Sequence, residues 1–88
     1  MITPTIGRKV WYWPTDYDLH YYVSFDDAQP FYATIVYARS DRRVNLAVLD
    51  HRGVGFCLND VFLCQDGERP LPGHASWRPY HKDQAAKA

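Results

Sequence analysis

Hydrophobic and polar residues alternate with a period of two in several short runs along this chain. The runs are rich in β-branched and aromatic residues, and the pattern therefore predicts β-strands. The predicted strands span residues 9–13, 32–38, 43–49, 55–58 and 61–64. The residues that share one face are Ala33, Ile35 and Tyr37 in the second run and Val44, Leu46 and Val48 in the third. No long segment has a 3.6-residue period, so we predict an all-β fold.

Proline and glycine residues mark the ends of these runs. Proline cannot donate a ladder hydrogen bond and glycine readily takes positive φ, so both delimit short strands. Residues 39–42 form a polar turn after the second run, while Asp50 and Gly53 predict a turn after the third, with Gly53 left-handed. In a chain of a few short strands, a flat sheet could not have both of its faces covered, so we expect the sheet to close into a small barrel. The predicted elements follow the order of an SH3-like barrel. In that order a first strand and a long loop precede three strands joined by tight turns, and a last short strand follows.

The chain has 88 residues, enough for one domain. We predict a single SH3-like β-barrel domain with a C-terminal strap at residues 1–81, and a flexible tail at residues 82–88. Trp77 and Tyr80 lie on either side of Pro79, and we interpret this segment as a strap that docks on the barrel surface. The alternative is that the two rings form a hook for a partner protein.

The composition is that of a folded domain, because 47% of the residues are hydrophobic and 16% are aromatic. Ten basic and ten acidic residues cancel, and this removes any general electrostatic attraction to nucleic acid. The first residues lack the apolar stretch of a secretion signal, and no apolar run approaches membrane-spanning length. With only two cysteines as well, the expectation is a reduced, cytoplasmic protein without membrane association.

The motifs FYATIV (residues 31–36), VNLAVLDHRG (residues 44–53) and DVFL (residues 60–63) resemble the Tudor and SH3-like barrel pattern. In that pattern an aromatic-x-A-x-V strand is followed by a strand that ends in D-x-G. The resemblance implies a barrel whose long first loop flanks the ligand groove. It also places His51 where the Tudor pattern has a tyrosine that forms one wall of the cage for methylated side chains.

A second resemblance extends over nearly the whole chain. The start MITPTIGRKVWY, the middle DRRVNLAVLD and the end WRPYHKDQAAK are similar to small proteins encoded in bacteriophages and prophages. Those proteins commonly open with G-R-x-V-W-Y and close with W-x-P-Y. The resemblance implies a phage or prophage origin, and hence a location in the cytoplasm of the bacterial host. It implies no activity and no functional residue.

Aromatic residues are concentrated near the N-terminus, where residues 9–32 hold nine of the fourteen rings. Residues 15–29 form a connection longer than compact domains usually contain without a role for it, although an alternation at residues 21–25 is compatible with a partial hairpin. A small core cannot hold so many rings, so we expect some to form a partner-binding surface. The residues predicted to bind a partner protein are Trp13, Tyr17, Tyr22 and Phe31. The alternative is that each ring packs over the open end of the barrel.

Arginine residues occupy two of the predicted turns, which an SH3-like barrel places on different rims. The possible nucleic-acid-binding residues are Arg39, Arg42, Arg43 and Arg52, with Arg8 and Lys9 adding to a positive stripe. Small barrels bind single-stranded nucleic acid with such positive stripes, which lie beside aromatic rings on which the bases stack. The alternative is ordinary solvated turns held by Asp41 and Asp50, and the zero net charge favours this alternative.

No metal or catalytic signature is present in the sequence. The series Asp16, Asp18, His20 and Asp27 has part of a calcium-loop spacing, but the glycine and the bidentate glutamate of an EF-hand are missing. Cys57 and Cys64 are spaced too widely for a zinc knuckle or a redox pair, so we interpret them as reduced thiols. We therefore predict no metal site, no cofactor and no enzyme activity.

These observations predict a non-catalytic accessory binding module of phage or prophage type. Its partner would be a phage or host protein, bound through a surface that includes Trp13, Tyr17, Tyr22 and Phe31. Two other functions remain open from the sequence. One is a nucleic-acid-binding barrel that uses the arginine turns. The other is a structural component of the virion, in which exposed strand edges pair between copies.

Overall fold

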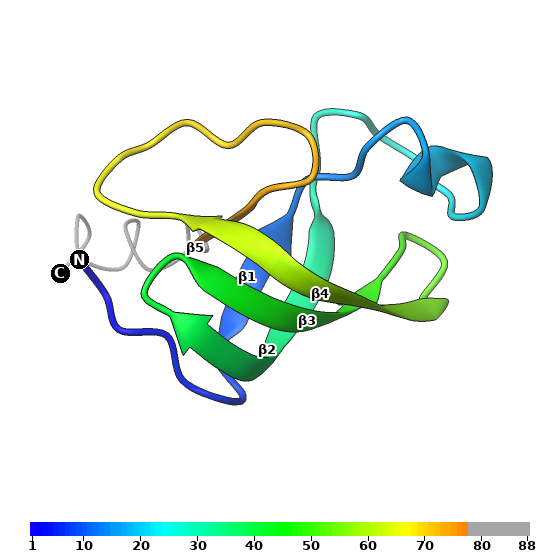
Figure 1. The fold of residues 1–88 in the computed structure, drawn as a ribbon. Helices are drawn as coiled ribbons and strands as arrows, with labels where there is room; N and C mark the ends of the chain where they lie inside the picture. Colours follow the sequence, from blue (N-terminus) through cyan, green and yellow to red (C-terminus); the bar gives the residue numbers. More distant parts are fainter. Residues whose placement is uncertain (78–88) are drawn as a thin grey trace, which may run out of the picture.

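Five strands form a closed barrel in the structure, a computed structural model that describes residues 1–77 (Figure 1). The strands are β1 (Lys9–Tyr12), β2 (Phe31–Ser40), β3 (Arg43–Leu49), β4 (Gly55–Cys64) and β5 (Ala75–Trp77). Strands β1 to β4 pair with one another in sequence order, all antiparallel. Strand β5 closes the barrel by pairing antiparallel with β1 and parallel with β4. The single helical element within residues 1–77 is a 3-10 turn, η1 (Asp18–His20), in the long first loop. The predicted all-β fold and small SH3-like barrel are confirmed.

The core is built from alternate residues of the strands, as the period-two pattern predicts. All of the following are buried: Val10 and Tyr12 of β1, Ala33 and Ile35 of β2, Val44, Leu46 and Val48 of β3, Leu63 of β4 and Ala75 of β5. The choice that the sequence left open in β1 is thereby decided, because Val10 and Tyr12 point inward while Trp11 and Trp13 are only partly buried.

The alternation in β2 breaks after Ile35. The pairing register between β2 and β3 shifts between Ile35 and Tyr37, and this bulge inserts an extra residue into β2. Since one added residue reverses the facing of all that follow, Tyr37 points to solvent and is 55% exposed. The prediction that Tyr37 shares the buried face of Ala33 and Ile35 is therefore wrong.

Residues 55–58 and 61–64, predicted as separate strands, are two halves of the bent strand β4. The bend lies at Asp60, whose φ of 56° is left-handed, and the register with β3 shifts between Val44 and Leu46. The amide of Asp60 donates to the Asn45 side chain at 2.9 Å, so the bulge is held from the neighbouring strand. A bulge of this kind bends a strand without ending it.

The fifth strand is β5, which lies in the segment predicted to be a docked strap and is instead part of the barrel. Val10, Trp11 and Tyr12 of β1 lie opposite Trp77, Ser76 and Ala75 of β5 in turn. Three residues are too few to reveal a period, so the pairing could not be read from the sequence. Tyr80 and the predicted tail at residues 82–88 lie outside the described residues.

Gln65 joins three distant parts of the chain just after β4. Its side chain is 2% exposed, and each of its polar atoms is used twice. The amide nitrogen donates to the carbonyl oxygens of Ile2, at 2.7 Å, and Asp41, at 2.9 Å. The amide oxygen accepts from the Ile2 backbone at 3.1 Å and from the Trp77 indole at 2.9 Å. Gln65 thus connects the N-terminal segment, the β2–β3 turn and β5.

Replacing Gln65 by leucine is expected to destabilise the barrel by about 2–3 kcal/mol, because four polar groups lose partly buried hydrogen bonds to its side chain. Chemical denaturation followed by far-UV circular dichroism measures this change. Gln29→Leu, at an exposed glutamine of the first loop, is the control and should unfold within about 0.5 kcal/mol of the natural chain. Equal midpoints for the two variants would contradict the role assigned to Gln65.

Candidate functional site

The long loop between β1 and β2 is attached to the barrel at several points, and the first is Asp18. Its buried carboxylate accepts hydrogen bonds from the Tyr12 hydroxyl at 2.5 Å and from the Thr15 amide at 2.9 Å. The Thr15 hydroxyl accepts in return from the Asp18 amide at 3.1 Å. Burial, followed by the hydrogen bond to Asp18, raises the pKa of Tyr12, so the phenol remains a donor. Asp18 is therefore a structural anchor of η1.

Asp50, at the end of β3, holds the middle of the loop. Its buried carboxylate accepts from the amides of Val23, at 2.9 Å, and Val54, at 3.0 Å. It also accepts from the backbone and guanidinium of Arg52, at 2.8–3.0 Å. Burial alone would raise the pKa of Asp50, but these hydrogen bonds outweigh it and hold the pKa well below its usual range. One carboxylate thus closes the β3–β4 turn, where Gly53 has a φ of 87°, and fixes the first loop to it.

His51 provides the third attachment. Its Nδ1 accepts from the Phe25 amide at 2.9 Å, which leaves Nε2–H to donate to the Pro30 carbonyl at 3.2 Å. The His51 backbone amide donates to the Val23 carbonyl at 3.1 Å. Both ring nitrogens are therefore occupied by the backbone of the loop itself. The first loop and the β3–β4 turn lie together at one end of the barrel (Figure 1).

Two of the four predicted partner-binding residues belong to the packing beneath the loop. Phe31 is fully buried in the barrel core, in edge contact with Phe56 and His51. The interpretation of Phe31 as a surface residue is wrong, because it is the first inward-facing position of β2. Tyr22 is partly buried and stacks on Phe56 with ring centroids 3.8 Å apart. Tyr22 thus packs against the core, and Phe56 covers one face of its ring.

The remaining rings of the loop are presented to solvent. Tyr17 is 70% exposed, Tyr21 63% and Phe25 73%. The rings of Tyr17 and Tyr21 contact each other with centroids 5.4 Å apart, and Phe25 lies beside His51. Tyr17 was predicted as a partner-binding residue, whereas Tyr21 and Phe25 were not singled out. We call Tyr17, Tyr21 and Phe25 the aromatic surface.

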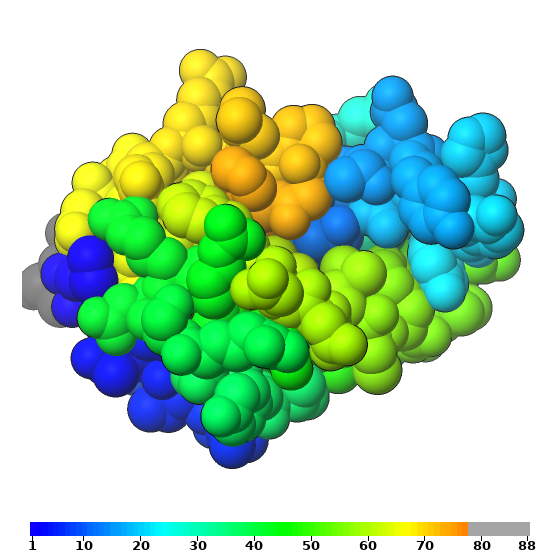
Figure 2. All heavy atoms as spheres, in the orientation of Figure 1, coloured from blue at the N-terminus to red at the C-terminus, as the bar shows by residue number. Residues whose placement is uncertain are grey.

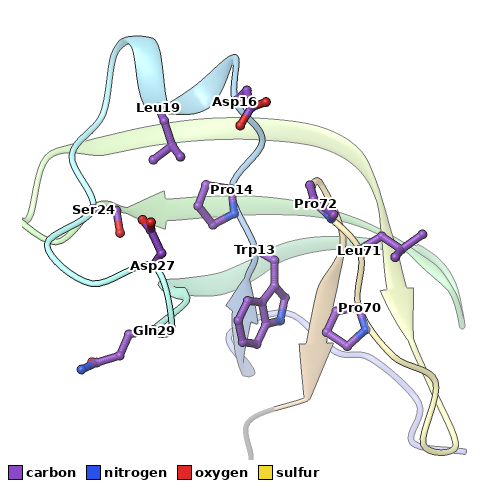
Figure 3. Close-up of a pocket in the computed structure, with 10 residues that line it drawn as sticks. All are labelled: Trp13, Pro14, Asp16, Leu19, Ser24, Asp27, Gln29, Pro70, Leu71 and Pro72. Atoms are coloured by element: carbon purple, nitrogen blue, oxygen red, sulfur yellow. The ribbon is translucent and has the colours of Figure 1, made fainter.

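A pocket of about 290 Å³ lies between the first loop and the segment before β5 (Figure 3). Its lining residues are Trp13, Pro14, Asp16, Leu19, Ser24, Asp27, Gln29, Pro70, Leu71 and Pro72. The two segments that form it lie side by side on one face of the molecule (Figure 2, blue to cyan and yellow to orange). They are held together where the Trp13 backbone exchanges hydrogen bonds with Gly73, at 2.7 Å, and His74, at 3.0 Å. Trp13, predicted as a partner-binding residue, is therefore part of a recess.

The arginines proposed for nucleic-acid binding are divided between opposite ends of the barrel, as the sequence predicts. Arg39, Arg42 and Arg43 lie at the β2–β3 turn, and Arg52 lies at the β3–β4 turn. Each has a partner: Arg39 donates to Asn45, Arg42 pairs with Glu68, Arg43 donates to the Asp60 carbonyl, and Arg52 pairs with Asp50. The four side chains therefore do not form one continuous stripe.

The two cysteines are free thiols in different environments. Cys57 is exposed on β4, whereas Cys64 is buried, with its sulfur 3.9 Å from Nδ1 of His74. Burial raises the pKa of the Cys64 thiol, which disfavours the reactive thiolate. Within residues 1–77, no three histidine, cysteine or acidic side chains come together as a metal site would require. Asp16, Asp18, His20 and Asp27 accordingly do not gather around one point.

Among the described residues, no helix has the length and apolar character that crossing a membrane demands. Comparison of the chain with known proteins finds no matching protein family, curated protein or solved structure.

Proposed function

We propose that this protein is a non-catalytic binding module of phage or prophage type that recognises a phage or host protein through the aromatic surface. The observation that carries the proposal is that three largely exposed rings, Tyr17, Tyr21 and Phe25, belong to one loop. Large exposed rings on a small soluble domain are typical of interaction sites. Tyrosine in particular is enriched among the residues that contribute most to binding.

The attachment of the loop supports the same proposal. Asp18, Asp50 and His51 hold it by hydrogen bonds at both of its ends and at its centre. A loop that is already ordered loses little conformational entropy when a partner binds, so more of the contact energy remains as affinity. The barrel thus acts as a rigid support for a surface that has no packing role of its own.

The two other functions have less support. A nucleic-acid site would need a stretch of uncompensated positive charge, but Arg42 and Arg52 form ion pairs and the four candidate arginines are divided between opposite ends of the barrel. The chain also has no net charge. A virion component that pairs by strand edges would need a long free edge, whereas the barrel is closed. Protein binding through the aromatic surface requires neither feature.

The proposal is tested by replacing Tyr17, Tyr21 and Phe25 together by serine. The immobilised chain should retain a specific protein from a phage-infected bacterial lysate, and the triple variant should retain at least tenfold less of it. Tyr37→Ser, at an exposed ring of β2, is the matched control and should bind normally. All three chains should melt within a few degrees of one another, because the changed residues are exposed.

Two results would contradict the proposal. Retention of the same proteins by the natural chain and by the triple variant would show that the aromatic surface does not bind them. Loss of retention after nuclease treatment would instead favour the nucleic-acid function.

A further inference from the structure

The indole of Trp13 is fixed in place at the pocket between the first loop and the segment before β5. Its Nε1–H donates to the Ser76 hydroxyl at 3.0 Å, and its backbone pairs with Gly73 and His74. Gly73 has a φ of 87°, which favours glycine, and a Cβ atom added there would lie 3.2 Å from the Thr15 side chain. The close approach of the Gly73 backbone to Thr15 therefore favours glycine. The orientation of the Trp13 ring is thus set before any ligand arrives.

Two carboxylates without partners line the same pocket. Within residues 1–77, neither Asp16 nor Asp27 takes part in a hydrogen bond or an ion pair, although the other loop aspartates, Asp18 and Asp26, both do. None of the ten lining residues is basic. Figure 3 shows Asp27 on the same side of the recess as Ser24, and Asp16 above Pro14. The pocket therefore combines negative charge with an aromatic wall and has no cation of its own.

The rest of the lining is mostly apolar, apart from Ser24 and Gln29. Pro14, Pro70, Leu71 and Pro72 contribute rigid or aliphatic surface, and the volume of about 290 Å³ lies near the lower end of ligand pockets. A recess of this size can hold one long side chain and is too small to enclose a nucleotide-sized cofactor. An apolar stem that ends in a positive charge matches the apolar, aromatic and acidic parts of the lining.

We propose that this pocket binds an arginine side chain of the partner protein. The guanidinium packs against the Trp13 ring and pairs with Asp16 and Asp27, while the aliphatic stem contacts Leu71 and the prolines. Guanidinium is better suited than ammonium, because it is planar, weakly hydrated and stacks on aromatic rings. This inference rests on the proposed function, since it identifies one chemical feature of the partner that the aromatic surface recognises.

The test uses the peptide acetyl-Gly-Arg-Gly-amide and follows the indole N–H signals by two-dimensional NMR. The Trp13 signal, assigned by its absence in Trp13→Phe, should shift saturably with a Kd on the order of 1 mM, as suits a single side chain. The same peptide with citrulline, which keeps the shape of arginine but not its charge, should not saturate the shift. Asp16→Asn combined with Asp27→Asn should weaken binding about fivefold.

Asp41→Asn is the matched control, because it makes the same kind of charge change at an exposed position of the β2–β3 turn. It should leave the arginine peptide bound as in the natural chain. Equal binding of the citrulline peptide, equal weakening by Asp41→Asn or the absence of any saturable shift would each overturn the proposal. Tighter binding of free spermidine than of the peptide would also overturn it, since the pocket would then serve a polyamine.

The two proposals fail separately. Should the arginine peptide not bind while the triple variant of the aromatic surface still loses its protein partner, only the role of the pocket is rejected. Should the peptide bind with the expected charge dependence while the triple variant retains every protein that the natural chain does, the pocket stands and the aromatic surface is rejected.

Discussion

A chain shortened to end at Gly73 is expected to have no stable folded state at 25 °C. The deletion removes β5, which pairs with β1 along three residues and with the end of β4 along two. It also removes the buried Ala75 and the Trp77 indole that donates to Gln65, and it deprives Trp13 of its hydrogen bond to Ser76. Without β5 the barrel is an open sheet with two free edges.

The size of this effect follows from the side chains that are lost. Deleting a large, fully buried aromatic residue lowers the free energy of unfolding by about 3–5 kcal/mol. Trp77 is partly buried, so its loss costs part of this amount, and the loss of Ala75 and of the ladder hydrogen bonds adds to it. A domain of this size has about 5–10 kcal/mol of stability in total, so little or none remains. Far-UV circular dichroism and one-dimensional NMR measure whether the shortened chain folds.

A chain that ends at His81 and keeps all of β5 is the control. It lacks only residues 82–88, which have no apolar stripe to bury, and it should melt within a few degrees of the full chain. A Gly73-terminated chain with cooperative unfolding near the melting temperature of the control would mean that β5 contributes little, and Trp77 would then become a candidate for partner binding.

The fold could be read from the sequence where one strand repeats the period-two pattern for long enough. Strand β3 is the clearest case, because Val44, Leu46 and Val48 alternate without interruption and the predicted bounds are those observed. The failures occur where a bulge changes the facing, at Tyr37 and Asp60, or where the strand is as short as β5. Bulges depend on the pairing of two strands, and a single run of residues does not contain that information.

The candidate site could be located from the sequence but not resolved into its residues. The density of rings identifies the first loop, yet nothing in the loop distinguishes Tyr17, which faces solvent, from Tyr22, which stacks on Phe56. The partner of Tyr22 lies 34 residues away on β4, so only the folded chain shows which ring is occupied. Phe31 differs, because period two could have shown that it leads the inward-facing set of Ala33 and Ile35, yet the prediction placed it on the surface.

The roles of the acidic residues in the loop could not be distinguished from the sequence either. Asp16, Asp18 and Asp27 look alike in the sequence. In the structure Asp18 accepts hydrogen bonds from the Thr15 backbone and the Tyr12 phenol, whereas Asp16 and Asp27 line the pocket. The calcium-loop spacing therefore had no structural meaning. What separates an anchor from a free carboxylate is its distance from buried donors, and this distance depends on the turn η1 that Asp18 itself helps to form.

Replacing Asp50 by alanine is expected to destabilise the protein by about 3–4 kcal/mol. The change leaves the amides of Val23 and Val54 and the Arg52 guanidinium without their shared, buried acceptor. For a domain of this length, the melting temperature should fall by about 15 °C or more. Calorimetry measures the shift, with Asp41→Ala at the exposed β2–β3 turn as the control. A shift below about 3 °C would show that Asp50 does not hold the loop.

The same carboxylate should make the stability of the fold sensitive to acid. Because the pKa of Asp50 is lowered in the folded state, the unfolded chain takes up the proton first as the pH falls. The contribution of Asp50 is therefore fully present above about pH 5 and is lost progressively below the unfolded pKa of about 3.9. Asp50→Asn cannot titrate, so its free energy of unfolding should fall less between pH 5 and pH 2 than that of the natural chain.

Some acid sensitivity should remain in Asp50→Asn, because a hydrogen bond from the Gln65 backbone amide lowers the pKa of Glu68 as well. The difference between the two chains, measured by denaturation at each pH, isolates Asp50. It should be largest near neutral pH and should shrink on acidification. A difference that stays constant down to pH 2 would mean that the charge of Asp50 does not stabilise the fold, and that the loop is held by the shape of this side chain alone.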